Sequence, residues 1–151
     1  MQTAKQLSVS LVNKPGRLAA VLTALSKEKV GFRALSLMDS GDRGTLRFVP
    51  DDYDAAKEVL EKTNIRCEGT EVLLTDVPSH RGAFRNICEK LAGEHLNIDY
   101  AYCSWSSNNG QRGVEVAVIK VNDLAKAQRV LGAAGHTSRR KRPGRRPVHV
   151  R

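Results

Sequence analysis

Two stretches of the chain decide its fold: LVNKPG at residues 11–16, and VPSHRG at residues 77–82. They align at an offset of 66, and residues 52–60 match 123–131 at an offset of 71. Self-similarity of this length indicates two copies of one structural unit. The five extra residues of the second copy fall most naturally at 106–110, whose composition suits a longer hairpin. The first offset also aligns the apolar positions after the turn: Leu18, Val21, Leu22 and Leu25 with Phe84, Ile87, Cys88 and Leu91.

The first copy alternates between strand and helix patterns. Leu7, Val9 and Leu11 recur at every second position, which is the period of a strand with one buried face. After the turn at 13–16, apolar residues recur at helical spacing, and Asp51 or Asp52 can cap a second helix. The predicted order is strand, helix, strand, strand, helix, strand, over residues 7–12, 17–29, 31–38, 45–49, 52–62 and 65–68.

The second copy repeats this order but stops one element early. Where its last strand should follow, the chain continues with Gly135, His136 and a basic run, and only residues 148–150 could pair. A sheet without its edge strand exposes unpaired backbone groups, so we expect this edge to invite pairing with another chain. The predicted elements are strands at 72–77, 98–105 and 114–121, with helices at 83–95 and 123–134.

The pattern predicts an α+β protein made of two tandem ferredoxin-like βαββαβ modules. We place the first module at residues 1–69 and the second at 70–135, followed by a disordered basic tail at 136–151. Each copy of about 70 residues has a marginal core of its own, so the two gain stability by packing together. We therefore expect antiparallel sheets packed side by side, with the helices on one face.

The net charge of +9 is concentrated at one end of the chain. Residues 136–151 hold seven Lys and Arg and no acid, so the other residues carry only +2. Any attraction to phosphate therefore belongs to the tail, chiefly to Arg139–Arg146. There is no signal-peptide pattern at the start and no apolar run near the ~20 residues of a membrane span. We expect a cytoplasmic protein with no membrane segment.

Catalytic and metal chemistry find no support in the sequence. The three cysteines Cys67, Cys88 and Cys103 are widely spaced without a CxxC pair, which favours buried free thiols over a disulfide framework or zinc site. His95, His136 and His149 show no metal-ligand spacing. No convergent acid, base and nucleophile is apparent. We therefore predict no catalytic residue, no metal and no cofactor.

The segment with binding chemistry is the turn from Asn13 to Leu18. Pro15 fixes one backbone angle, and Gly16 lets a ligand approach the main chain. The first amides of the following helix lack internal partners, and the helix dipole favours an anion such as a carboxylate. Asn13 adds a short amide that can donate and accept. The alternative is a plain structural turn, which the same residues also fit.

In this context the sequence resembles the ACT family of amino-acid-binding regulatory domains, and in particular stand-alone proteins with two such domains. The resemblance rests on residues 13–18 and on the second strand at 30–35, and it covers about residues 5–135. It implies that domains pair edge to edge and bind a small metabolite, usually an amino acid, between the loop of one domain and the second strand of its neighbour. It also implies no catalysis. Our own hypothesis adds that the chain forms a homodimer, through sheet edges or helices, and that a downstream protein receives the signal. Carried over by position, the first site uses Asn13, Pro15, Gly16, Arg17 and Leu18, facing Ile98, Asp99 and Tyr100 of the other copy.

The second turn departs from the family pattern. Ser79 stands where Asp or Asn is expected, and Arg81 replaces the proline, although Gly82 is kept. We therefore expect one good site per chain and one altered or vacant site. This weaker site would comprise Ser79, His80, Arg81 and Gly82, facing Phe32, Arg33 and Ala34.

Three alternative functions stay open from the sequence. The first is a nucleic-acid-binding protein of the RNA-recognition type, which shares the βαββαβ order and would use the basic tail. Such domains stack bases on central-strand aromatics, and only Phe48 is available here at 45–49. The second is a metal chaperone or small hydrolase of similar topology. The chaperone would need paired cysteines in the first loop, and residues 13–17 have none, while the hydrolase would need convergent acid, base or nucleophile groups. An interaction module with a vestigial ligand site differs from a sensor only in its binding behaviour.

Overall fold

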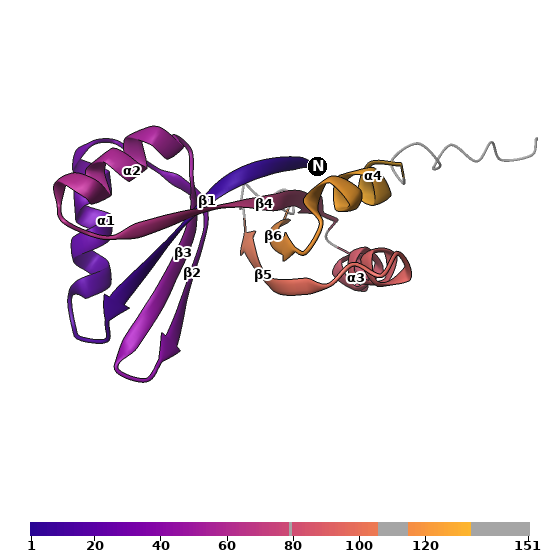
Figure 1. The fold of residues 1–151 in the computed structure, drawn as a ribbon, viewed down its shortest axis with the longest axis horizontal. Helices are drawn as coiled ribbons and strands as arrows, with labels where there is room; N and C mark the ends of the chain where they lie inside the picture. Colours follow the sequence, from indigo (N-terminus) through magenta and orange to yellow (C-terminus); the bar gives the residue numbers. More distant parts are fainter. Residues whose placement is uncertain (79, 106–114, 134–151) are drawn as a thin grey trace, which may run out of the picture.

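The computed structural model describes residues 1–78, 80–105 and 115–133. Within these ranges the chain forms one six-stranded antiparallel sheet and four helices (Figure 1). The elements are β1 (Gln2–Val12), α1 (Arg17–Lys27), β2 (Phe32–Ser40), β3 (Arg43–Pro50), α2 (Tyr53–Lys62), β4 (Cys67–Val77), α3 (Ala83–Gly93), β5 (Ile98–Trp105), β6 (Glu115–Val121) and α4 (Leu124–Ala133).

The order of elements confirms the repeated pattern, including its local signals. The Asp52 carboxylate caps α2 by accepting a hydrogen bond from the Ala55 amide at 3.1 Å. Asp51 instead accepts the Gly31 amide at 3.1 Å, which ties the start of α2 to the approach of β2. The first three helices each end next to a residue with left-handed backbone, namely Lys29, Asn64 and His95, all at φ 56°.

The missing last strand of the second copy is supplied by the start of the chain. The sheet order is β2-β3-β1-β4-β6-β5, so β1 and β4 lie together at its centre. β1 begins at Gln2, five residues before the predicted start, and Gln2 to Ala4 pair with Leu74 to Val72 of β4. These β4 residues form the first strand of the second copy. The expectation that this edge is open to another chain is therefore wrong.

No alternation of apolar and polar residues in the sequence reveals the early start of β1. Residues 2–6 read QTAKQ, which contains one small apolar residue, Ala4. Yet Gln6 is completely buried, because two tyrosine hydroxyls satisfy its side-chain amide. A buried polar residue in a hydrogen-bonded network looks like a surface residue in the sequence.

Both helix pairs cover the same face of the sheet, as predicted. On β4, Cys67 packs against the core of the first half, while Leu73 and Val77 belong to the core of the second half. These residues are separated by even numbers of positions, so they point to one face of the strand. Phe48 lies in the first core and Leu91 in the second, each almost fully buried.

On the helix-free face, the two ends of the sheet come into contact with each other. β2 and β5 stand at opposite ends of the strand order, yet they lie in contact. A third buried cluster forms between them on this face: Ala34, Val49, Val72, Leu74 and Val118. Figure 1 shows the result, with α1 and α2 at one end of the molecule, α3 and α4 at the other, and strands between them.

The two halves are joined more closely than a boundary at residue 69 suggests. That position lies within the continuous strand β4, which replaces the two short strands predicted at 65–68 and 72–77. The longer hairpin predicted at 106–110 and the disordered tail predicted at 136–151 lie outside the described residues. Among residues that are described, no helix is long and apolar enough to cross a membrane.

Candidate functional site

The first turn presents open main-chain amides at the start of α1. Gly16 occupies the N-cap position with φ 84°, and no side chain caps the helix there. The Arg17 amide contacts the Lys14 carbonyl at 3.4 Å, and the regular helix bonds start with Ala20 N–H donating to the Gly16 carbonyl at 3.0 Å. Within the described part of the chain, the amides of Leu18 and Ala19 have no backbone acceptor. They are therefore available to an anion.

Asn13 is held in place by the neighbouring β2–β3 turn. Its backbone amide donates to the Asp42 carbonyl at 2.8 Å, and its side-chain nitrogen donates to the Gly41 carbonyl at 3.3 Å. The Asn13 side-chain oxygen remains to accept from a ligand. The second N–H of the same amide is also left over, so Asn13 can still both donate to a ligand and accept from it, as expected.

A cavity of about 270 Å³ opens beside this turn. It lies below the 300–1,000 Å³ of drug-sized sites, which suits a molecule as small as an amino acid. Its charged residues are Lys14 and Arg17 with Asp39 opposite in sign, a combination that matches a zwitterion. The full lining is Leu11, Val12, Asn13, Lys14, Arg17, Leu18, Leu37, Met38, Asp39 and Gly44.

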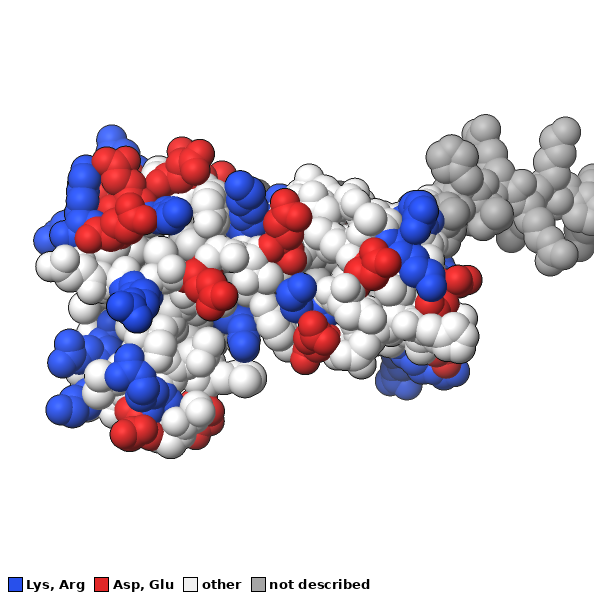
Figure 2. All heavy atoms as spheres, in the orientation of Figure 1, with Lys and Arg blue, Asp and Glu red and all other residues white. Residues whose placement is uncertain are grey.

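The cavity lies at an exposed edge of the molecule. Leu37 and Met38 of the edge strand β2 are 48% and 54% exposed. Figure 2 shows Lys and Arg side chains gathered on the side of the molecule where the β1–α1 turn and the β2–β3 turn lie. Pro15 and Gly16 shape the turn but do not line the cavity.

The second turn has the same backbone and different side chains. Gly82 has φ 81° and again no side-chain cap, and Asn86 N–H donates to its carbonyl at 2.9 Å. The His80 Nδ1 lies 3.1 Å from the Arg81 carbonyl. His80 borders a separate cavity of about 350 Å³ between β4, α3, α4 and Met1, which Arg81 and Gly82 do not line. Ser79 lies outside the described residues.

Within one chain, neither turn meets its expected partner strand. Ile98 packs in the second core, Asp99 accepts a bond from Asn97, and Tyr100 reaches Gln6 on the helix-free face. On β2, Phe32 is 46% exposed, Arg33 lies against the Gln2 side chain, and Ala34 is buried in the closed face. The residues that do join the first turn come from the far end of β2, at 37–39, next to the turn at 39–42. The sequence points to them only through the segment DSGD at 39–42, whose polar and glycine residues indicate a hairpin turn.

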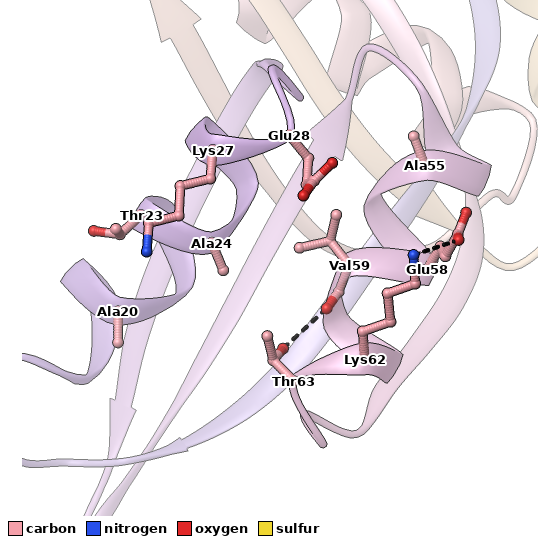
Figure 3. A pocket seen from close by; sticks show the side chains of 10 residues that line it. All are labelled: Ala20, Thr23, Ala24, Lys27, Glu28, Ala55, Glu58, Val59, Lys62 and Thr63. Carbon is pink, nitrogen blue, oxygen red and sulfur yellow. Dashed lines mark hydrogen bonds and ion pairs between the residues drawn. The ribbon is translucent and has the colours of Figure 1, made fainter.

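A larger hollow, of about 530 Å³, lies between α1 and α2 (Figure 3). Small side chains such as Ala20, Ala24 and Ala55 leave the space between the helices. The charged groups on its rim neutralise one another, since Lys62 pairs with Glu58 at 2.8 Å. No set of polar groups converges there, so the smaller cavity beside Gly16 is the better ligand site.

The described residues offer no group of metal ligands, and Cys67 lacks the character of a reactive thiol. No group of three or more His, Cys, Asp and Glu in the described ranges could hold a metal ion. Cys67, Cys88 and Cys103 are partly buried thiols rather than fully buried ones. Burial and the nearby Glu61 raise the pKa of Cys67, which is the opposite of what a nucleophilic cysteine needs.

The chain belongs to the ACT domain family: residues 2–133 match the ACT domain pair. The solved structure of protein BT0572 from Bacteroides thetaiotaomicron is similar, with 32% identity and a TM-score of 0.79, covering 88% of this chain and 89% of that one. The regulatory subunit of aspartate kinase from Thermus thermophilus shares the fold at 19% identity and a TM-score of 0.62, covering 87% and 91%. The regulatory subunit of aspartate kinase from Thermus flavus also shares the fold, at 18% identity and a TM-score of 0.56, covering 90% of this chain and 98% of that one. No curated protein matches the chain in sequence.

Family membership confirms the predicted fold and the class of protein. ACT domains are regulatory modules associated with small-molecule sensing, and this chain consists of a pair of them over residues 2–133.

Proposed function

We propose that this chain is a sensor that binds an amino acid at the turn from Asn13 to Leu18 and that it has no catalytic activity. The observation that carries the proposal is the left-handed Gly16 turn, which leaves the Leu18 and Ala19 amides without a backbone acceptor and whose residue Leu18 lines a 270 Å³ cavity. A repeated ferredoxin-like unit needs no such cavity for its own stability.

The cavity can hold both ends of an amino acid. The carboxylate would accept from the Leu18 and Ala19 amides, with the helix dipole and the cations Lys14 and Arg17 adding attraction. The ammonium group would donate to the Asn13 side-chain oxygen and pair with Asp39. The side chain would then contact the apolar lining provided by residues such as Leu37 and Met38.

The open rim of the site supports a homodimer formed through β2. β2 is an edge strand of the sheet and exposes Phe32, Leu37 and Met38. Pairing two β2 strands antiparallel, about a two-fold axis near the strand centre, brings Phe32 and Arg33 of one copy beside Met38 of the other. Phe32 and Arg33 would then complete the first site from the second copy, rather than Ile98, Asp99 and Tyr100.

Signalling follows from this geometry if ligand stabilises the paired state. A ligand that contacts both copies binds the dimer more tightly than the monomer, and only such a difference can shift the equilibrium. The receiver that we propose is a separate protein.

In the described residues, the central strands offer no aromatic side chain for base stacking on the helix-free face; the basic tail at 136–151, on which the nucleic-acid alternative also rests, lies outside them. An RNA-recognition domain stacks bases on its helix-free face. Here the centre of that face is buried between β2 and β5, and Phe48 lies in the helix-side core at 1% exposure. The cytoplasmic location remains our expectation from the sequence.

A thermal-shift screen of the twenty amino acids tests the proposal. The wild type should be stabilised by one amino acid or a small group of them, because a ligand that binds only the folded state raises Tm. Gly16→Asp places a carboxylate where the ligand carboxylate should bind, and should abolish the shift. The matched control is Gly82→Asp, which makes the same change at the same backbone angle in the second turn.

The control variant Gly82→Asp should keep the rise in Tm that the amino acid produces in the wild type. If no amino acid stabilises the wild type, or if the shift persists in Gly16→Asp, the proposed site is wrong. Sedimentation equilibrium with and without the stabilising amino acid checks the dimer separately, and a chain that stays monomeric with ligand bound contradicts the β2 pairing.

A further inference from the structure

The helix-free face is open beside its buried centre. A groove with a cavity of about 780 Å³ lies there, lined by β1, β3 and β4 of the sheet together with Tyr100 of β5 and Lys120 of β6. Its volume is within the range of sites for small ligands. This groove is separate from the cavity beside Gly16. Gly44 lines that cavity, whereas Arg43 and Thr45 on either side of it line the groove, because adjacent strand residues point to opposite faces.

The groove is strongly basic. Four cations line it, Arg43, Arg47, Arg66 and Lys120, against the single acid Glu68. The ion pairs of the described residues all lie on α2 and α3, so none of these four cations is neutralised by a carboxylate. Like charges gathered in a concave surface raise the local potential and attract an oppositely charged ligand.

Neutral groups hold two of the guanidinium groups in place. Arg43 donates from Nε to the Ser10 hydroxyl at 2.8 Å and from Nη2 to the Ser10 carbonyl at 3.2 Å. Arg47 stacks on the Tyr100 ring at 4.0 Å from its centre. Tyr100 is itself fixed by Gln6, whose amide donates to the tyrosine oxygen at 2.7 Å. These contacts orient the guanidinium groups without cancelling their charge.

Hydroxyl groups complete the chemistry of the groove. Ser8 and Ser10 of β1, Thr45 of β3 and Thr70 of β4 line it among the cations. Guanidinium and ammonium groups with hydroxyls nearby are the donors that bind phosphate and carboxylate oxygens.

We propose that this groove binds a small polyanion, a molecule with two or more negative charges on phosphate or carboxylate groups. Arg43 and Arg47 come from the first half of the chain, whereas Lys120 and Tyr100 come from the second. A polyanion in the groove therefore contacts both halves and stabilises the arrangement in which β2 and β5 close over the sheet. This binding does not depend on an amino acid at the Gly16 turn.

Isothermal titration calorimetry on the full chain tests the proposal, with pyrophosphate and citrate as probes at low ionic strength. Removal of two groove cations in Arg43→Gln/Arg66→Gln should weaken binding by about tenfold or more. The matched control Arg85→Gln/Arg129→Gln removes two arginines from α3 and α4 and should change affinity by less than about twofold. All variants keep the basic residues at 136–151, so any binding by these residues is the same in each.

A second variant covers the case in which the double variant fails to fold. Glu68→Gln removes the only acid of the groove and should tighten binding by about two- to fivefold, a gain that misfolding cannot produce. Preference for pyrophosphate identifies phosphate as the natural chemistry, and preference for citrate identifies carboxylate. The proposal is overturned if neither probe binds, if the groove variant and its control weaken binding equally, or if Glu68→Gln leaves affinity unchanged.

Discussion

The two halves of the chain have the same backbone at the turn and different surroundings. Gly16 and Gly82 cap their helices at φ 84° and 81°, and Lys29 and His95 end them at φ 56°. Four residues of the first turn, Asn13, Lys14, Arg17 and Leu18, line a cavity together with the apolar edge of β2, whereas of residues 80–82 in the second turn only His80 borders a cavity. The repeat therefore duplicates the main-chain amides, whereas the side chains from a neighbouring edge decide whether they form a site.

A second comparison concerns whether each half of the chain is stable without the other. Each half has its own core under its own helices, but β1 and β4 serve both halves, and a third cluster lies between them. We infer that the halves share their stability although they are separate in sequence.

The largest expected effect tests this shared stability. Phe48→Ala in the first core should lower the free energy of unfolding by about 3–5 kcal/mol, since it leaves a cavity at a fully packed site. The chain has one tryptophan, Trp105, in the second half. Its fluorescence transition in urea should shift as far as the far-UV circular dichroism transition. Leu91→Ala in the second core makes the test in the other direction and should likewise shift both transitions together. Two separate transitions, with that of Trp105 unmoved by Phe48→Ala, would contradict the inference.

Gln6 is the polar connection between the halves, and its loss should cost somewhat less. It donates to the Tyr100 hydroxyl at 2.7 Å and accepts from Tyr102 at 2.8 Å. Gln6→Leu leaves both hydroxyls without this partner and should destabilise the protein by about 2–4 kcal/mol. Adding Tyr100→Phe and Tyr102→Phe should recover part of that loss, because no unsatisfied hydroxyl then remains. A triple variant less stable than Gln6→Leu in urea denaturation would argue against this account.

The two glycine turns should respond alike in stability. Nothing lies within 4 Å of a Cβ built on Gly16 or Gly82, so alanine meets only the cost of left-handed backbone, about 1–2 kcal/mol at each position. Gly93→Ala, with equal open space at the end of α3, should instead be neutral or stabilising. Urea denaturation of the three variants compares them. Unequal losses at the two turns would show that their backbones differ in solution.

The smallest effect is a dependence on alkaline pH at the connection between the halves. Burial raises the pKa of Tyr102 above its ordinary value near 10, and the neighbouring Tyr100 adds to the rise. The unfolded chain then loses this proton at lower pH than the folded one. The contribution of protonated Tyr102 to the free energy of unfolding is therefore fully present below about pH 10. It declines above that pH, by up to about 1 kcal/mol per pH unit.

Tyr102→Phe isolates this contribution. The variant is less stable throughout, because Gln6 loses a donor, but its stability should fall less steeply between pH 10 and 11. Equal slopes for the wild type and the variant in urea denaturation would show that Tyr102 ionises as easily when folded.

The sequence predicts most of the fold and only one part of the site. The repeat, the four helices and the Asp52 cap follow from local spacing, which the chain carries in consecutive residues. The Asn13 to Leu18 turn could be predicted for the same reason, because its chemistry is that of a backbone corner. Leu37, Met38 and Asp39 could not be assigned to it, since they reach it only through the pairing of β2 with β3 and of β3 with β1.

By itself, the sequence determined that there are two βαββαβ units, where each glycine turn falls, and that the body of the chain is nearly neutral. The tertiary structure alone decided that Gln2 to Ala4 complete the second unit, that the helix-free face closes, and that four cations share one groove. The physical reason is how far apart along the chain the interacting residues lie. Local patterns record how a segment contacts its own neighbours, whereas strand partners and the burial of a residue such as Gln6 depend on segments far along the chain.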